Sequence, residues 1–178
     1  MRYVQRVTNC ILMNNDDVLM LKKPSRGWWV APGGKMEQRE SILESVTREF
    51  KEETGLNIKQ PELRGIYTII IEEQGNILDE WMMFTFQAKK YTGQMLNESP
   101  EGILDWKQKN EFVNLQMAKG DYEIFDHVIH GEGIMYGNFT YTEGFDLLSY
   151  RLEVAGKPPK VYETKQNIQK VGMDNGQN

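Results

Sequence analysis

The chain has 178 residues, 39% of them hydrophobic and 26% charged, which is enough for one globular domain with a buried core. Its net charge of −5 and isoelectric point near 5.2 are the opposite of the basic surface that binds polymeric nucleic acid. Polymeric nucleic acid is therefore not the expected partner, whereas a small phosphorylated molecule needs only a few local cations.

The N-terminus and the cysteine content indicate the compartment. The first residues lack an apolar signal core, and no apolar run is long enough to span a membrane. The single cysteine, Cys10, rules out an internal disulfide. We therefore expect a soluble, cytoplasmic protein without a membrane partner.

Hydrophobic spacing and turn residues divide the chain into strands and one long helix. Gly55 ends the helix, at a position where glycine commonly adopts the left-handed conformation. The predicted elements are, in order, strands at 3–13 and 17–22, an extended segment at 27–34, the helix at 40–54, strands at 63–72 and 77–89, a loop at 92–101, a strand at 103–106, helical turns at 108–128, and a hairpin of 133–141 with 145–153.

Strands on both sides of one long helix predict the α/β class, a sandwich with a central mixed β-sheet. We expect this domain to cover residues 1–155. The polar tail at 156–178 contains Pro158-Pro159, and its composition predicts disorder. If the tail is ordered it must pack on something, so a homodimer is a further prediction.

Three acidic residues near the end of the helix, Glu49, Glu52 and Glu53, are spaced to share one face. Like charges at this spacing repel by roughly 0.2–0.5 kcal/mol per pair. The helix dipole also disfavours negative charge near a C-terminus. A hard divalent cation cancels both penalties and prefers oxygen ligands. A solvated acidic face is the alternative explanation for such a cluster taken alone.

The cluster is part of a longer pattern that starts at Gly34. Glu40 follows after five residues, and after seven more the chain continues as Arg48-Glu49-Phe50-Lys51-Glu52-Glu53-Thr54-Gly55-Leu56. Every defined position resembles the signature of the Nudix hydrolase superfamily, and the wider likeness covers about residues 3–153. The resemblance implies a Nudix α/β/α sandwich and metal-dependent hydrolysis of a phosphoanhydride bond.

The same resemblance implies a role for each matched residue. Mg²⁺, with Mn²⁺ as an alternative, would be held by Glu49, Glu52 and Glu53 and by the Gly34 carbonyl oxygen. Arg48 would orient Glu49 through a charge-assisted hydrogen bond. The roles of Gly33, Glu40 and Gly55 would be structural.

A carboxylate must also accept the proton of the attacking water. Glu52 or Glu53 can do this from the helix. Glu98 and Glu101, in the loop before a tryptophan-containing strand, are candidates from outside the helix. A solvated acidic loop is an equally good explanation of these two residues.

Two classes of substrate fit the sequence. The chain resembles the MutT-like branch, which implies cleavage of a guanine-type nucleoside 5′-triphosphate, such as 8-oxo-dGTP or dGTP, to the monophosphate and pyrophosphate. It also resembles bacterial Nudix enzymes that convert the alarmone (p)ppGpp to pGpp. A ligand with phosphates at both ends needs extra cations, for which the candidates are Arg6, Lys22, Lys23, Arg26 and Lys35. Solvation is the alternative role of such lysines.

Three further residues are candidates for contacting the base. Trp28 and Trp29 are adjacent, so in an extended segment their rings face opposite sides, and one could stack on a purine while burial of both is the alternative. Asp121 corresponds in position to an acid that contacts the base edge in MutT-like enzymes, and a helix N-cap is its alternative role.

Two rival functions use the same residues. A nucleotide sensor that does not cut its ligand would lose metal carboxylates, and this sequence keeps all of them. Decapping of RNA 5′ ends calls for a basic surface, which the acidic charge argues against.

Overall fold

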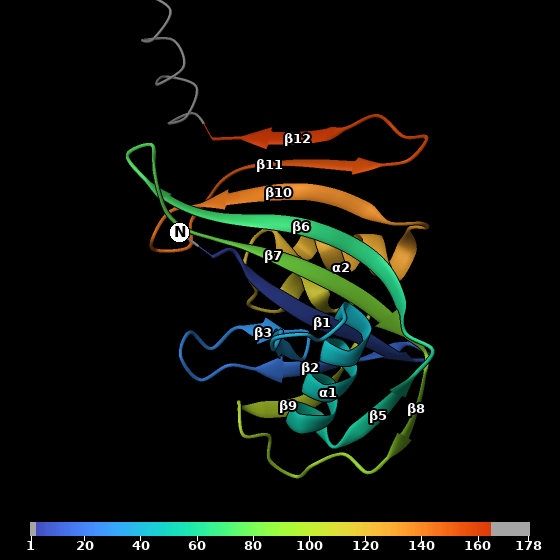
Figure 1. Cartoon of the computed structure of the whole chain (residues 1–178). Coiled ribbons are helices and arrows are strands. Elements are labelled where there is room, and N and C mark those ends of the chain that lie inside the picture. The colour runs from blue at the N-terminus through green and yellow to red at the C-terminus, as the bar shows by residue number, and fades with distance from the viewer. Residues whose placement is uncertain (1–2, 165–178) are drawn as a thin grey trace, which may run out of the picture.

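The computed structural model describes residues 3–164, which form a mixed β-sheet with one α-helix on each side (Figure 1). Its strands are β1 (Gln5–Asn14), β2 (Asp17–Lys22), β3 (Trp29–Val30), β4 (Gly33–Lys35), β5 (Leu56–Lys59), β6 (Glu62–Glu73), β7 (Asn76–Ala88), β8 (Lys90–Gly93), β9 (Ile103–Gln108), β10 (Met135–Tyr141), β11 (Leu147–Val154) and β12 (Lys160–Glu163). The helices are α1 (Ile42–Thr54), a 3-10 turn η1 (Phe112–Asn114) and α2 (Asp121–His130).

The main sheet runs β12-β11-β10-β6-β7-β1-β2-β3, with β4 paired to β1 and β9 paired to β2. Strands β1 and β7 are parallel, as are β10 and β6, and the other pairs are antiparallel. The predicted α/β sandwich with a mixed sheet is confirmed. Strands β5 and β8 form a separate two-stranded sheet.

Local signals place both ends of α1. The Ser41 hydroxyl accepts a hydrogen bond from the Glu44 backbone N–H while the Glu44 carboxylate accepts one from the Ser41 N–H, which is a capping box. Gly55 has φ 80° and ends the helix as predicted. Phe50 and Val46 are fully buried against the β1 side of the sheet, so the helix holds its carboxylates at a fixed position on that face.

Helix α2 covers the opposite face, with Ile124, Phe125 and Val128 buried. A buried guanidinium ties its C-terminal end to the sheet: Arg64 of β6 donates hydrogen bonds to the carbonyl oxygens of Gly131 at 2.7 Å and Gly133 at 3.0 Å. A cation at this end of a helix satisfies unpaired carbonyls and complements the helix dipole. Arg64 therefore fixes where α2 lies on the sheet.

The long strands and the helix were predicted correctly to within a few residues, but five short strands (β3, β4, β5, β8 and β12) were not predicted as strands. The prediction of disorder is wrong for residues 160–163, because β12 pairs with β11 and Lys160 forms an ion pair with Glu123 of α2 at 2.6 Å. Residues 165–178 of the predicted tail lie outside the described residues.

Neither α1 nor α2, the α-helices within 3–164, is long and apolar enough to cross a membrane.

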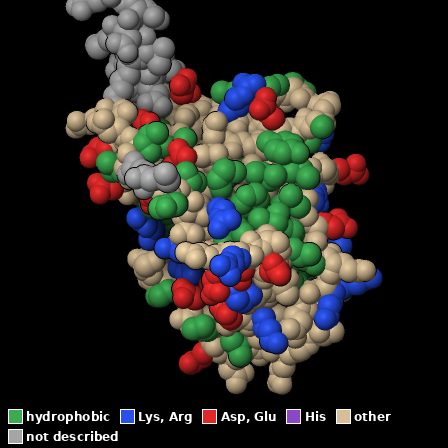
Figure 2. All heavy atoms as spheres, in the orientation of Figure 1, with side chains coloured by type: hydrophobic (Ala, Val, Ile, Leu, Met, Phe, Trp, Pro, Cys, Tyr) green, Lys and Arg blue, Asp and Glu red, His purple; other side chains and the backbone are tan. Residues whose placement is uncertain are grey.

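Part of the sheet carries an exposed hydrophobic surface. Helix α1 packs on β1, β4 and β5, and Figure 2, which views this side, shows hydrophobic side chains gathered above a region of intermingled charges. Surfaces of this kind often mark contact sites. The homodimer stays a prediction.

Candidate active site

The buried acid of the site is Glu53, on the last turn of α1. It is only 4% exposed, and the Gly33 N–H donates a 3.0 Å hydrogen bond to its Oε2. Gly34 faces the neighbouring acid, because a Cβ added there would lie 2.3 Å from the Glu49 carboxylate. Gly34 therefore lies closer to the Glu49 carboxylate than any side chain would permit, and Gly33 hydrogen-bonds Glu53 from the same strand.

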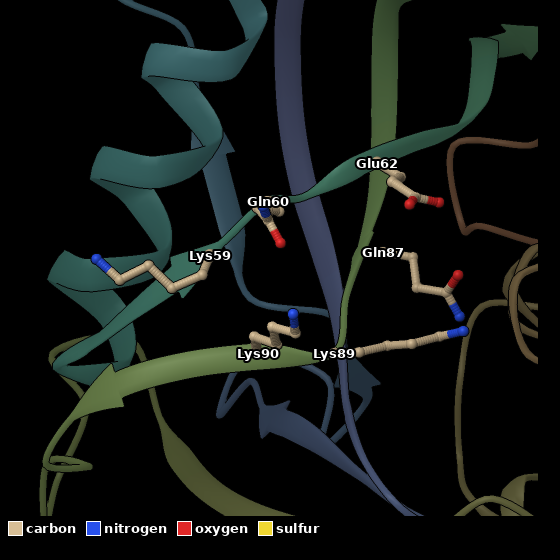
Figure 3. Close-up of a pocket in the computed structure, with 6 residues that line it drawn as sticks. All are labelled: Lys59, Gln60, Glu62, Gln87, Lys89 and Lys90. Carbon is tan, nitrogen blue, oxygen red and sulfur yellow. The ribbon is translucent and has the colours of Figure 1, made fainter.

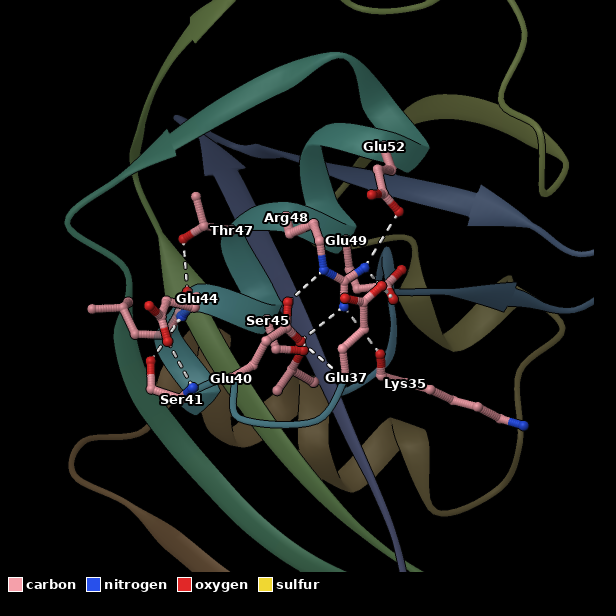
Figure 4. A network of polar contacts seen from close by, with 12 residues as sticks. Lys35, Glu37, Glu40, Ser41, Glu44, Ser45, Thr47, Arg48, Glu49 and Glu52 are labelled. Carbon is pink, nitrogen blue, oxygen red and sulfur yellow. Dashed lines mark hydrogen bonds and ion pairs between the residues drawn. The ribbon is translucent and has the colours of Figure 1, made fainter.

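Arg48 organises the acids along α1 (Figure 4). Its guanidinium donates to Glu40 through Nε and Nη2, to Glu49 Oε1 at 2.9 Å and to Glu52 Oε2 at 3.4 Å. It also donates to the carbonyl oxygen of Lys35 at 3.2 Å. The contact expected between Arg48 and Glu49 is present. The hydrogen bonds from Arg48 and from the Glu37 N–H lower the pKa of Glu40 to about 2, so Glu40 stays ionised as the anchor of the guanidinium.

Lys23 brings a loop acid to the helix. Its Nζ lies 3.5 Å from Glu53 Oε1 and 2.9 Å from Glu101 Oε2. Glu98 is exposed, and no ion pair within residues 3–164 joins it to α1. Of the two loop candidates, the contacts therefore favour Glu101, and a catalytic role for Glu98 stays a prediction.

The electrostatics of Glu53 show how close the acids are. Burial is the main reason that its pKa rises to about 7, and repulsion from Glu101 and Glu49 adds to the rise, against the Gly33 hydrogen bond and the Lys23 ammonium. Carboxylates that raise the pKa of a neighbour lie within electrostatic reach of one another. A cation placed among them would remove this repulsion.

The donor set fits a hard divalent cation, although the acids are not yet gathered as ligands. Glu52 is a neighbour of Glu53 on the helix and lies about 100° round its axis, with a side chain 58% exposed. Within residues 3–164 no three acidic, histidine or cysteine side chains converge on one point, and the acids of α1 are engaged by Arg48 and Lys23. Carboxylate and carbonyl oxygens are the ligands that Mg²⁺ and Mn²⁺ prefer, so Glu49, Glu52, Glu53 and the Gly34 carbonyl remain the predicted set.

On the other face of the sheet, three polar groups lie in a row without partners. Asn9 of β1 pairs with Thr85 of β7, and Thr85 pairs in turn with Gly65 of β6. The hydroxyl of Tyr67 lies over Gly65. The Asn9 Oδ1, Thr85 Oγ1 and Tyr67 hydroxyl are buried and have no hydrogen-bond partner among the described residues. Buried polar groups are nearly always satisfied, so this polar row (Asn9, Thr85 and Tyr67) is an exception within the described fold.

Asp121 is the first residue of α2, the helix that covers the face of the sheet where Tyr67 is buried. The cap position itself belongs to Gly120, whose N–H donates to the Tyr141 hydroxyl. Desolvation raises the pKa of Asp121 to about 7. Burial raises the pKa of the Tyr67 and Tyr141 hydroxyls, and repulsion from the Asp121 carboxylate adds to both shifts. The structure thus gives Asp121 neither a side-chain capping bond nor a cation within residues 3–164.

An aromatic cluster adjoins the polar row along β7. The ring of Trp28 contacts Phe145 edge-on at 5.9 Å, and Trp81 lies 6.4 Å from Phe145. The guanidinium of Arg26 stacks on Phe145 at 4.6 Å and on Trp28 at 5.1 Å. Phe145 has φ 64°, an unusual conformation for a residue with a side chain. Arg26 is therefore engaged with aromatic rings and lies among them, not among the acids of α1.

The remaining cation and tryptophan candidates lie apart from the acids. Lys22 and Lys107 place their ammonium groups 5.8 Å and 4.4 Å from the ring of Trp29. The side chain of Lys35 extends away from the Arg48 network (Figure 4). Of the predicted phosphate-binding cations, only Lys23 is joined by an ion pair to the acids within residues 3–164.

A separate cavity of about 200 Å³ lies among three lysines, Lys59, Lys89 and Lys90. Figure 3 shows that Lys59 and Lys89 point away from each other and from Lys90. Cations that diverge do not form a common anion site, so this cavity is not part of the candidate active site.

Several residues of the site were missed from the sequence. Asn9, Tyr67 and Thr85 each sit at an ordinary position of a β-strand, and only the pairing of three strands shows that they adjoin. Phe145 was placed in a hairpin, and nothing local marks its unusual backbone. Strand alternation could have shown which residues share a face within one strand, but not which strands are neighbours.

The arrangement of a glycine strand against a capped acidic helix, on one face of a mixed sheet, is that of a known hydrolase family. A model of the NUDIX domain matches residues 4–129, and the chain belongs to the Nudix family. Hydrolases of this family act on small nucleotide substrates and use divalent metal ions, usually Mg²⁺.

The chain is also similar to individual proteins of this family. The chain is 56% identical over 153 residues to the uncharacterised Nudix hydrolase YvcI of Bacillus subtilis, covering 86% of this chain and 97% of that protein. It is 57% identical to the mutator MutT protein of Bacillus halodurans, whose crystal structure superposes with a TM-score of 0.82 over 87% of this chain and all of that chain. It is 38% identical over 93 residues to the human 8-oxo-dGDP phosphatase, covering 51% of this chain and 26% of that protein.

Proposed function

We propose that the chain hydrolyses a guanine-type nucleoside 5′-triphosphate, such as 8-oxo-dGTP or dGTP, to the monophosphate and pyrophosphate. The observation that carries this proposal is the polar row of unpartnered groups on the face of the sheet that α2 covers. The row includes Asn9 of β1, whose partner Gly33 on β4 donates a hydrogen bond to Glu53 of α1. Similarity to the human 8-oxo-dGDP phosphatase also supports an oxidised guanine, although that match covers a quarter of its length.

The chemistry of these groups suits a guanine edge. Guanine offers N–H donors beside a carbonyl acceptor. The Asn9 carbonyl oxygen can accept from an N–H, and the Tyr67 hydroxyl can donate or accept. A carboxyl group with a pKa of about 7 is partly protonated near neutral pH, so Asp121 can donate to a carbonyl oxygen as well as accept from an N–H. A base that leaves these groups unpaired is bound less well.

The acids of α1 serve the reaction itself. Bound Mg²⁺ or Mn²⁺ would neutralise charge on the phosphates and promote ionisation of the attacking water. Arg48 keeps Glu49 and Glu52 oriented, and the Gly33 N–H does the same for Glu53. Glu53 and Glu101 are both close enough to the site to accept a proton from the water, so either is the proposed base.

Alarmone hydrolysis is the second candidate function. It needs a further group of cations for the second phosphate cluster. Lys22 lies by Trp29 and Arg26 stacks on Phe145, so the predicted cations are dispersed and not gathered at one place. The contacts therefore favour the triphosphate over (p)ppGpp.

A comparison of kcat/KM for 8-oxo-dGTP, dGTP, 8-oxo-dGDP, ppGpp, pppGpp and ADP-ribose tests the proposal. We expect the guanine triphosphates to rank first, with pyrophosphate as product and no activity when divalent metal is chelated. Glu53→Gln should lower kcat at least 100-fold, whereas Glu73→Gln, at the exposed end of β6, should not. A preference for ADP-ribose or ppGpp would refute the proposed substrate, and full activity without metal would refute the proposed mechanism.

A further inference from the structure

Lys23 differs from the other cations of the site in that it joins two acids from separate parts of the fold. Its ammonium contacts Glu53 at the end of α1 and Glu101 in the loop before β9. The Glu53 side chain is only 6% exposed, and that of Lys23 is 31% exposed. The contact therefore lies at the boundary between the buried acid and solvent.

Hydrogen bonds hold the backbone around Lys23, while its side chain extends to the two acids. The Lys23 N–H donates to the Trp28 carbonyl oxygen at 2.8 Å, and its own carbonyl accepts from the Gly27 N–H at 2.9 Å. Next to it, Gly102 approaches so closely that an added Cβ would lie 2.1 Å from the Lys22 carbonyl oxygen. A lysine ammonium on a flexible four-carbon chain can change partners without any movement of this backbone.

We propose that Lys23 is a resident counter-cation, which competes with the catalytic metal for the Glu53 and Glu101 oxygens and moves to the substrate phosphates when the metal binds. The inference rests on the proposed function, because it assumes that these acids bind the metal. Ammonium and metal are both cations, so a metal bound at these oxygens would repel the Lys23 ammonium, and the two would compete for the acids. Arg48 is different, since its contacts with Glu40 leave its guanidinium in place.

The proposal predicts effects of opposite sign from one substitution. Lys23→Met removes the competing cation, so Mn²⁺ alone should bind about tenfold more tightly by isothermal titration calorimetry. The same variant lacks the cation that meets the phosphates, so at saturating Mn²⁺ its KM for dGTP should rise about tenfold while kcat changes less. Loss of structure would instead weaken both binding events.

Two other variants serve as controls. Lys109→Met removes an equal charge from a lysine paired with Asp16, at the far end of β9 from Glu101. This variant should leave both the Mn²⁺ affinity and the KM for dGTP unchanged. Lys23→Arg keeps a cation in place and should bind Mn²⁺ about as tightly as the unaltered protein.

The outcomes separate the two proposals. Tighter Mn²⁺ binding by Lys23→Met, with a higher KM and an unaffected Lys109→Met, supports the inference. Equal or weaker Mn²⁺ binding by Lys23→Met, in a protein that otherwise binds Mn²⁺, overturns the inference alone. If neither the unaltered protein nor Lys23→Met binds Mn²⁺, the proposed metal site fails and the inference with it.

Discussion

The buried carboxyl of Asp121 makes the stability of the fold depend on pH in a way that one substitution should remove. Desolvation raises its pKa from 3.8 to about 7, and a difference of this size corresponds to about 4 kcal/mol. Because the folded-state pKa is the higher one, the folded protein holds a proton that the unfolded chain releases. The free energy of unfolding therefore falls as pH rises from about 4 to about 7.

Asp121→Asn keeps the shape of the side chain and cannot ionise. We expect its free energy of unfolding to match that of the unaltered protein near pH 4 and to exceed it by up to about 4 kcal/mol above pH 7. Urea unfolding in metal-free buffer between about pH 4 and pH 8 measures the difference. Glu53, whose pKa is also raised, is present in both proteins, so its contribution cancels from the comparison.

The competing effect is the dipole of α2, which favours a negative charge at this first residue of the helix. If the dipole outweighed burial, Asp121→Asn would lose stability relative to the unaltered protein as pH rises. That result would refute the reasoning from burial. A difference that stays constant with pH would refute it as well. Asp126→Asn, on the exposed side of the same helix, controls for loss of one negative charge.

Three further predictions concern the supports of the site. Gly34→Ala places a Cβ 2.3 Å from the Glu49 carboxylate, so kcat should fall at least 100-fold while circular dichroism stays native. Arg48→Lys cannot contact all its acidic partners at once, so kcat should fall about tenfold and Mn²⁺ binding measured by calorimetry should weaken. Arg64→Met leaves the Gly131 carbonyl and its neighbours unpaired, so urea unfolding should show a loss of about 3 kcal/mol.

Matched substitutions test whether these losses are specific. Gly144→Ala meets side chains only at ordinary contact distances and should keep full kcat. Arg151→Met removes an arginine that is half exposed on β11 and should cost well under about 1 kcal/mol. If Arg151→Met destabilised the fold as much as Arg64→Met, burial of the guanidinium would not explain the effect. Unchanged metal binding by Arg48→Lys would contradict its orienting role.

The acidic helix could be predicted because its signals are local. The capping residue Ser41, the apolar spacing of Val46 and Phe50, and Gly55 all lie within fifteen residues of one another, and each acts through neighbours in sequence. The contacts of Arg48 with Glu49 and Glu52 also arise within one helix. Hydrogen bonds and side-chain pairs at helical spacing depend little on the rest of the fold.

The loop acid and the polar row could not be predicted in the same way. Whether Glu98 or Glu101 meets the helix depends on the register of β9 on β2, which aligns Lys22 with Ile103. The polar row requires the parallel pairing of β1 with β7, joined by a long connection in the sequence. Such pairings depend on the packing of the whole sheet and leave no local signature.

Successive residues of strand β1 face the acidic helix on one side of the sheet and the polar row on the other. Thr8 faces α1, where its hydroxyl lies 2.9 Å from that of Ser45, and Asn9 faces the opposite side with the polar row. Gly33 of β4 pairs with Asn9 of β1, and the Gly33 N–H donates a hydrogen bond to Glu53. A shift of one residue in this pairing would exchange the two faces. The register of β1 and β4 therefore sets both where the acids meet the backbone and which polar groups lie on the opposite face of the sheet.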